Sequence, residues 1–270
     1  MALTVRVRVP AADVEWVSDI LWSHGVVAIE ELPRVDGNVD LRTSLGDDRE
    51  TTRVALGDLP PGTHWEFEEI DAGITETWRA HMAPFDVGEA LTIVPRWTTG
   101  SVVEPGRIAV TIEPGSTFGM GDHPTTRGCL TVLEGLDVRG RRVLDVGCGS
   151  GILGVVALML GAEWAHGVDI NPASRAVSEA NATFNGVGDR WSVDDVLDDR
   201  STVYDVVFAN ILAPVLIDLA ASIAARVAPG GVLVLSGVLD GRYDHVVDAY
   251  AGRRVVDRRM IEGWATLVLS

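Results

Sequence analysis

A glycine-rich turn between an apolar strand and an apolar helix is the sharpest chemical signal in the chain. The segment Val143-Leu-Asp-Val-Gly-Cys-Gly-Ser-Gly151 begins with a run typical of a buried strand, and residues 152–160 follow as a helix. Gly147, Gly149 and Gly151 have no Cβ, so a ligand can pack directly against the backbone at the helix N-terminus. The turn therefore predicts a cofactor-binding site.

An acidic residue at the end of the next predicted strand, residues 165–170, strengthens this prediction. Asp169 lies 22 residues after Gly147. A carboxylate at this position can accept hydrogen bonds from both hydroxyls of an adenosine ribose. The turn and the carboxylate together fit NAD and S-adenosylmethionine equally well.

Three details favour S-adenosylmethionine. Asp145 precedes the glycines and suits a cationic methionine amine or sulfonium better than a pyrophosphate. The glycine spacing is GxGxG, whereas the nicotinamide pattern is GxGxxG. Asn210 ends the predicted strand at residues 205–209, so its amide is expected opposite the glycine turn, where it could orient a nucleophile. With these details the chain resembles a class I methyltransferase.

The chain also resembles one family within that class. The segments that carry the resemblance are Glu113-Pro-Gly-Ser-Thr-Phe-Gly-Met-Gly-Asp-His-Pro-Thr-Thr126, Gly147 to Gly151, Asn210-Ile-Leu-Ala213 and Ser236-Gly237. They are similar to the bacterial PrmA type, which methylates large-subunit ribosomal protein eleven on lysine side chains and terminal amines. The resemblance covers nearly the whole chain, but Met120 and Asp122 stand where the family commonly has threonine.

The resemblance implies an S-adenosylmethionine-dependent protein lysine N-methyltransferase that acts on lysine side-chain or N-terminal amines of a large-subunit ribosomal protein. It places Thr126, Gly147, Asp169 and Asn210 at the cofactor, and the glycine turn adds Gly149 to these cofactor-binding residues. Asn210 is also the expected catalytic residue, because its amide can accept a hydrogen bond from the amine and aim its lone pair. No metal is expected.

Several residues of the family motif also fit ordinary structural roles. Residues 118–121 read either as a flap over the cofactor or as a surface turn. His123 is a candidate base, although a loop-ordering role is favoured because it has no partner at metal-ligand spacing. A hydroxyl of Thr125 or Thr126 could cap the helix predicted at residues 130–136.

The sequence also allows more than one role for the acidic pair Asp194 and Asp195 and for the linker. Asp194 or Asp195 could reach the adenine amine, but an acidic solvated turn is favoured. Residues 75–82 are expected to form one or two helical turns, and Trp78 and Trp97 could line a substrate groove or pack the linker against the domain.

Three regions are expected along the chain. Residues 1–70 follow a β-α-β-β-α-β order and predict a small ferredoxin-like α+β domain for substrate recognition. Residues 71–99 read as a linker, and residues 100–270 as the methyltransferase domain, an α/β Rossmann-like sheet. Its last two strands, residues 255–260 and 264–269, have no crossover between them, so the last strand should be antiparallel.

Composition limits the partners and the location. The net charge is 22 − 39 = −17, which disfavours direct nucleic-acid binding and favours a basic partner. All the basic residues are arginine, so Schiff-base and P-loop lysine chemistry are excluded. The apolar runs are too short for a membrane span and no secretory signal is seen, so a cytoplasmic location is expected.

Other functions remain open from sequence alone. The same site chemistry would serve a methyltransferase of another protein or of a small molecule. Protein glutamine methyltransferases usually carry Asn-Pro-Pro-Tyr where this chain has Asn210-Ile-Leu-Ala213. A non-catalytic cofactor-binding regulatory module is the alternative of another class, and a nicotinamide dehydrogenase ranks third.

Overall fold

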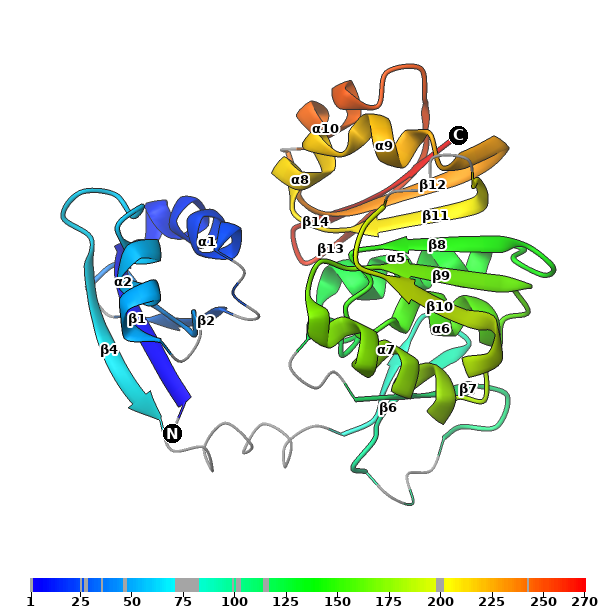
Figure 1. Ribbon diagram of the computed structural model, residues 1–270, viewed down its shortest axis with the longest axis horizontal. Helices are drawn as coiled ribbons and strands as arrows, with labels where there is room; N and C mark the ends of the chain where they lie inside the picture. Colours follow the sequence, from blue (N-terminus) through cyan, green and yellow to red (C-terminus); the bar gives the residue numbers. More distant parts are fainter. Residues whose placement is uncertain are drawn as a thin grey trace. The chain divides into compact units, whose positions relative to one another are not determined.

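The chain forms two compact units, Met1–Met82 and Ala83–Ser270 (Figure 1). The structure, a computed structural model, describes residues 2–24, 26, 29–34, 36–45, 48–70, 83–98, 100, 103–113, 117–197, 202–241 and 243–270. The second unit begins before the limit at residue 100 that the sequence suggested, because residues 91–95 form a strand that pairs with residues 108–112 on one side and with residues 85–87 on the other. The helical turns expected at residues 75–82, and Trp78 with them, lie outside the described residues.

The first unit has the predicted order of elements. These are β1 (Ala2–Pro10), η1 (Ala11–Asp13), α1 (Val14–Ser23), β2 (Ile29–Pro33), β3 (Asn38–Thr43), α2 (Arg49–Leu56) and β4 (His64–Ile70). The strands form an antiparallel sheet in the order β2-β3-β1-β4. The second helix is weakly patterned, and it is secured by the Asp48 carboxylate, which accepts a hydrogen bond from the Thr51 amide.

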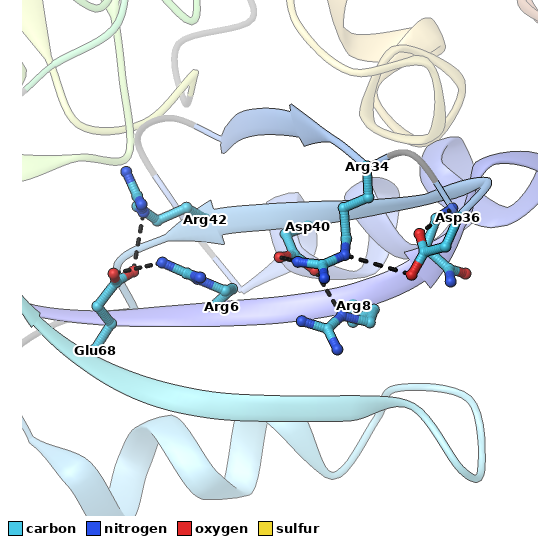
Figure 2. A network of polar contacts seen from close by, with 8 residues as sticks. Arg6, Arg8, Arg34, Asp36, Asp40, Arg42 and Glu68 are labelled. Carbon is cyan, nitrogen blue, oxygen red and sulfur yellow. Dashed lines mark hydrogen bonds and ion pairs between the residues drawn. The ribbon is translucent and has the colours of Figure 1, made fainter.

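Apolar and charged side chains alternate along β1, so the sheet of this unit has one apolar face and one charged face. Val5, Val7 and Val9 are buried in the core of this unit. The charged face holds two clusters in which a carboxylate lies between two arginines: Glu68 with Arg6 and Arg42, and Asp40 with Arg8 and Arg34 (Figure 2). The hydrogen bond from Arg8 is the main cause of the lowered pKa of the buried Asp40. The four arginines of this face are therefore committed to ion pairs.

The second unit is built on a mixed seven-stranded sheet. Its strands are β8 (Arg142–Val146), β9 (Trp164–Val168), β10 (Trp191–Asp194), β11 (Tyr204–Asn210), β12 (Val227–Leu239), β13 (Val255–Ile261) and β14 (Trp264–Leu269). The order is β10-β9-β8-β11-β12-β14-β13, and the pairs from β10 to β12 are parallel. Strand β14 is antiparallel to both β12 and β13, as the sequence predicts for the last strand.

Helices cover this sheet, and a smaller sheet lies beside them. The helices are α5 (Pro124–Gly135), α6 (Ile152–Met159), α7 (Pro172–Phe184), η2 (Gly188–Arg190), α8 (Ala213–Asp218), α9 (Ala220–Ala224) and α10 (Asp244–Ala249). Helices α8, α9 and α10 gather over the half of the sheet that β11, β12 and β14 form (Figure 1). Within the described ranges, no helix is long and apolar enough to cross a membrane.

The smaller sheet has the order β5-β6-β7 and was only partly expected. Its strands are β5 (Phe85–Val87), β6 (Leu91–Pro95) and β7 (Ile108–Ile112), of which the sequence indicated only the middle one. The Glu134 carboxylate on α5 accepts hydrogen bonds from the amides of Glu89 and Ala90, at 3.0 and 2.8 Å. This contact ties the β5–β6 turn to α5, the helix that carries Thr126.

Two predicted helix limits are wrong. The sequence predicts one helix over residues 213–227 that ends at Pro229, Gly230 and Gly231. In the structure this segment divides into α8 and α9, and residues 229–231 lie within β12. A register shift accommodates them, since Tyr204 pairs with Val227 but Val206 pairs with Val232. The helix expected at residues 130–136 begins earlier, at Pro124, because the His123 side chain caps it.

Candidate active site

The glycine turn after β8 depends on conformations that only glycine adopts readily. The φ angles of Gly147, Gly149 and Gly151 are +73°, +51° and +77°. A Cβ at Gly147 would lie 2.1 Å from the side chain of Ile211, and one at Gly149 would lie 2.5 Å from the carbonyl oxygen of Phe118. The space beside each of these two missing Cβ atoms is therefore occupied by a neighbouring segment of the chain. The glycines let these neighbouring segments close around the turn.

Asp169 is fixed against this turn. Its Oδ2 atom accepts a hydrogen bond from the Gly149 amide at 2.7 Å, and its Oδ1 atom accepts one from the Asn171 amide at 2.8 Å. Each carboxylate oxygen keeps a second lone pair for a ligand hydroxyl. The next side chain, Ile170, is 89% exposed and offers an apolar surface beside the carboxylate. The arrangement fits an adenosine ribose and its flat base.

Asn210 ends β11 beside the same turn. Parallel pairing of Ala209 with Val146 places Asn210 next to Gly147. Its Nδ2 atom is 3.5 Å from Oγ1 of the buried Thr126 on α5. Ile211 holds the strand end in place, because its side chain packs against Gly147 and its carbonyl oxygen would lie 2.2 Å from a Cβ at Gly237. The structure therefore brings Thr126, Gly147 and Asn210 together.

His123 orders the start of α5. Its side chain accepts a hydrogen bond from the Thr125 amide, so neither threonine caps the helix, contrary to one of the interpretations of the sequence. The ring centroid of His123 lies 5.3 Å from that of Phe118 and 5.2 Å from that of Trp264. Burial lowers its pKa, which favours the neutral ring. These contacts support the loop-ordering role.

Residues 117–121, which we call the flap, lie directly on the glycine turn. The Ser150 amide donates a hydrogen bond to the Phe118 carbonyl at 2.9 Å, and the Ser150 hydroxyl donates one to the Gly119 carbonyl at 2.5 Å. Gly119 and Gly121 have φ angles of +104° and +102°. The flap is thus bound to the turn, as an independent surface turn would not be.

The acidic pair at the end of β10 faces solvent. The side chains of Asp194 and Asp195 are 63% and 70% exposed, and Arg175 forms ion pairs with them at 3.6 and 3.4 Å. Only the backbone of Asp194 is tied to the site, through its carbonyl, which accepts a hydrogen bond from the Asp169 amide. These contacts favour the solvated turn over a role at the adenine.

Two polar residues of this site were missed in the sequence. Ser150 carries the flap contacts, and the amide of Asn181 on α7 donates a hydrogen bond to the Ser150 carbonyl at 2.9 Å. The only signal for Asn181 was a second asparagine, Asn185, one helical turn later. Neither serine in a turn nor asparagine on a helix predicts such contacts, because their partners are distant in sequence.

Asp145 lies beneath the turn and is 1% exposed. Burial is the main cause that raises its pKa to about 7, while a hydrogen bond from the Gly154 amide at 3.4 Å opposes the shift. The carboxyl group is therefore largely protonated in mildly acid solution. Its side chain is directed to the start of α6, so the sequence-based suggestion that it meets a cationic ligand gains no support here.

This raised pKa predicts a pH-dependent stability. An unfolded carboxyl titrates near pH 3.9, so between about pH 4 and pH 7 the folded chain holds a proton that the unfolded chain has lost. Raising the pH through this window should lower the free energy of unfolding by up to about 1.4 kcal/mol per pH unit from this group.

Asp145→Asn should flatten that dependence, because the amide does not titrate and can still accept the Gly154 hydrogen bond. Urea unfolding of both proteins at pH 5 and pH 7.5 measures the difference. Comparing the two proteins cancels the contributions of the other carboxylates. Identical pH dependence in the two proteins would contradict the assignment of the raised pKa to Asp145.

Comparison with known proteins agrees with this geometry. A family model described as ribosomal protein L11 methyltransferase (PrmA) matches residues 54–270. The chain belongs to this family. The ribosomal protein L11 methyltransferase of Chromohalobacter salexigens is 43% identical over an alignment that covers 84% of this chain and 77% of that protein. That of Pseudomonas aeruginosa is 37% identical, covering 97% of this chain and 96% of that protein.

A solved structure leads to the same family. The crystal structure of the ribosomal protein L11 methylase from Lactobacillus delbrueckii subsp. bulgaricus matches with a TM-score of 0.64 and 28% identity, covering 70% of this chain and 97% of that one. The fold is an α/β methyltransferase fold with a mixed sheet. Family membership confirms the predicted activity, S-adenosylmethionine-dependent methylation of a ribosomal protein, and the dehydrogenase alternative is set aside.

Proposed function

We propose that this protein methylates lysine side-chain amines, the N-terminal amine, or both, on ribosomal protein L11, and that Asn210 orients the amine. The observation that carries the proposal is the meeting of Asn210, Thr126 and the glycine turn at the carboxyl ends of β8 and β11. Ligands of parallel α/β sheets bind at this end of the strands. The names of the relatives supply the substrate.

Five residues are proposed at the cofactor: Thr126, Gly147, Gly149, Asp169 and Asn210. Their fit to S-adenosylmethionine rests on the Asp169 carboxylate, which backbone amides hold in place with lone pairs to spare, and on the exposed Ile170 beside it. When bound, the cofactor supplies an activated methyl group on its sulfonium. No covalent protein intermediate is needed, so the chain acts by positioning.

The Asn210 amide is oriented for this work. Its Nδ2 atom points to the Thr126 hydroxyl, and no described residue donates a hydrogen bond to its Oδ1 atom. That oxygen can accept a hydrogen bond from the incoming amine and direct the nitrogen lone pair to the methyl group. The amine must be neutral to have a lone pair, and free lysine has a pKa of about 10.4, so activity should rise with pH.

Asp169→Ala is expected to weaken cofactor binding without unfolding the protein. The substitution removes an acceptor for two ribose hydroxyls, which should cost about 1.5 to 3 kcal/mol, or roughly tenfold to 150-fold in Kd. Titration calorimetry with S-adenosylmethionine measures this loss. Asp195→Ala is the matched control, because that carboxylate is exposed and ion-paired away from the turn. Unchanged affinity in a folded Asp169→Ala protein would disprove the ribose assignment.

The first unit is proposed to be a ferredoxin-like domain that recognises the substrate protein. Its element order and its strand order β2-β3-β1-β4 support the assignment. Residues 1–70 carry 6 arginines against 14 acidic residues, a net charge of −8, which suits a basic protein and disfavours a nucleic acid. A cytoplasmic location, where ribosomal proteins are made, accords with this role.

The decisive assay uses ribosomal extract from a strain that lacks the enzyme. The purified protein and labelled S-adenosylmethionine are added, and the labelled bands are identified by mass spectrometry. Label on the lysine or terminal amines of protein L11 is the expected result. Label on another protein, or only on small molecules, would show that the substrate assignment is wrong. If the protein binds the cofactor but transfers no label, a regulatory module is favoured.

A further inference from the structure

The side chain of Asn181 lies at a junction between the glycine turn and the end of β7. It is fully buried on α7. Its Nδ2 atom donates to the carbonyls of Ser150 and Glu113, both at 2.9 Å, and its Oδ1 atom accepts from the Glu113 amide at 3.0 Å. One amide thus joins two backbone segments that are distant in the sequence.

Asn185 makes a parallel set of bonds one turn further along the chain. Its Oδ1 atom accepts from the Thr111 amide at 2.8 Å, and its Nδ2 atom donates to the carbonyls of Thr111 and Asn181 at 2.7 and 2.8 Å. Both asparagines therefore form hydrogen bonds with backbone groups at the outer edge of β7, at Thr111, or just after it, at Glu113. Within the described residues, no strand pairs with β7 on that side. Only Asn181 also reaches the glycine turn.

The bonds of Asn181 continue to the flap through Ser150. The Ser150 carbonyl accepts from Asn181, while its amide and hydroxyl donate to the carbonyls of Phe118 and Gly119. Glu113, the other partner of Asn181, lies four residues before the flap begins at Thr117. Asn181 therefore fixes the chain before the flap and the turn on which the flap lies.

We propose that Asn181 is a positioning residue for methyl transfer, which sets the place of the flap against the glycine turn. The proposal rests on the cofactor site proposed above. Without the Asn181 amide, the Glu113 amide and the carbonyls of Glu113 and Ser150 lose these three hydrogen bonds, so the two segments are no longer held in register. The flap would then lose its position against the glycine turn.

Asn181→Ala and Asn185→Ala form a matched pair of variants. Each removes an amide that makes three hydrogen bonds, two to backbone carbonyls and one from a backbone amide, that of Glu113 or that of Thr111. Hydrogen exchange is measured on the ligand-free proteins, followed by the Kd for S-adenosylmethionine, kcat and thermal stability. We expect Asn181→Ala to speed exchange in peptides covering residues 117–121 and 147–151, and to raise Kd and lower kcat each by about tenfold. Asn185→Ala should change Kd and kcat by less than about twofold.

A purely structural role predicts that both variants lose stability and activity in proportion, and that result would overturn the proposal. Unchanged exchange in the flap of Asn181→Ala would overturn it too. If Asn181→Ala does not fold, Asn181→Asp decides, because it keeps the acceptor for the Glu113 amide but loses the side-chain amide that donates to the Ser150 and Glu113 carbonyls, and it should speed flap exchange and raise Kd. Absence of cofactor binding by the wild-type protein would refute the proposed site, and the exchange data would still decide whether Asn181 holds the flap.

Discussion

Deletion of residues 1–82 should abolish methylation of the ribosomal protein while leaving the affinity for S-adenosylmethionine unchanged. All five proposed cofactor residues lie in the unit Ala83–Ser270. That unit has its own core between the sheet and its helices, and the first unit has a separate core around β1. The truncated protein is therefore expected to fold and to keep its cofactor site.

Loss of methylation would follow if the first unit recognises the substrate. Its net charge of −8 over residues 1–70 should attract a basic protein over a long range, so the association rate should fall as salt rises, with little change in cofactor affinity. Full-length and truncated proteins are assayed at two salt concentrations against the isolated ribosomal protein, with calorimetry as the folding and binding control. Full activity of the truncated protein would refute recognition by this unit.

The sequence predicts those parts of the site that depend on local patterns. The turn from Gly147 to Gly151 follows from glycine spacing after an apolar strand, and Asp169 follows from its place at the end of the next strand. The sequence predicts a helix over residues 172–184, which are the limits of α7, and Asn171 with Pro172 gives it a clear start. Each of these signals lies within a few residues of the element that it determines.

Features that depend on distant partners could not be predicted. Ser150 meets Asn181 and the flap only after the chain has folded. Residues 229–231 look like a helix stop, yet pairing of β12 with β11 absorbs them in a register shift. The outer strands of the sheet β5-β6-β7 could not be predicted, because they are only three and five residues long. Tertiary pairing decides such short elements, which carry too little pattern of their own.

Asn210→Ala should lower turnover far more than it lowers cofactor affinity. If the amide oxygen orients the amine, its loss leaves the nucleophile free to rotate away from the line of transfer. Loss of such positioning costs on the order of 100-fold in kcat. The Kd for S-adenosylmethionine should change by less than about threefold, because Asp169 and the glycine turn remain.

Thr126→Val tests the orientation of the same amide. The Thr126 hydroxyl lies 3.5 Å from Nδ2 of Asn210, and valine keeps the shape of threonine while it removes this acceptor. The Asn210 amide could then turn, so kcat should fall by about tenfold, less than in Asn210→Ala. Single-turnover rates and calorimetric Kd values are compared for the wild-type protein, both single variants and the double variant. If Asn210 acts through its oxygen and Thr126 only orients it, the double variant should be no slower than Asn210→Ala. Equal losses of Kd and kcat in Asn210→Ala would instead make Asn210 a cofactor ligand without a part in orienting the amine.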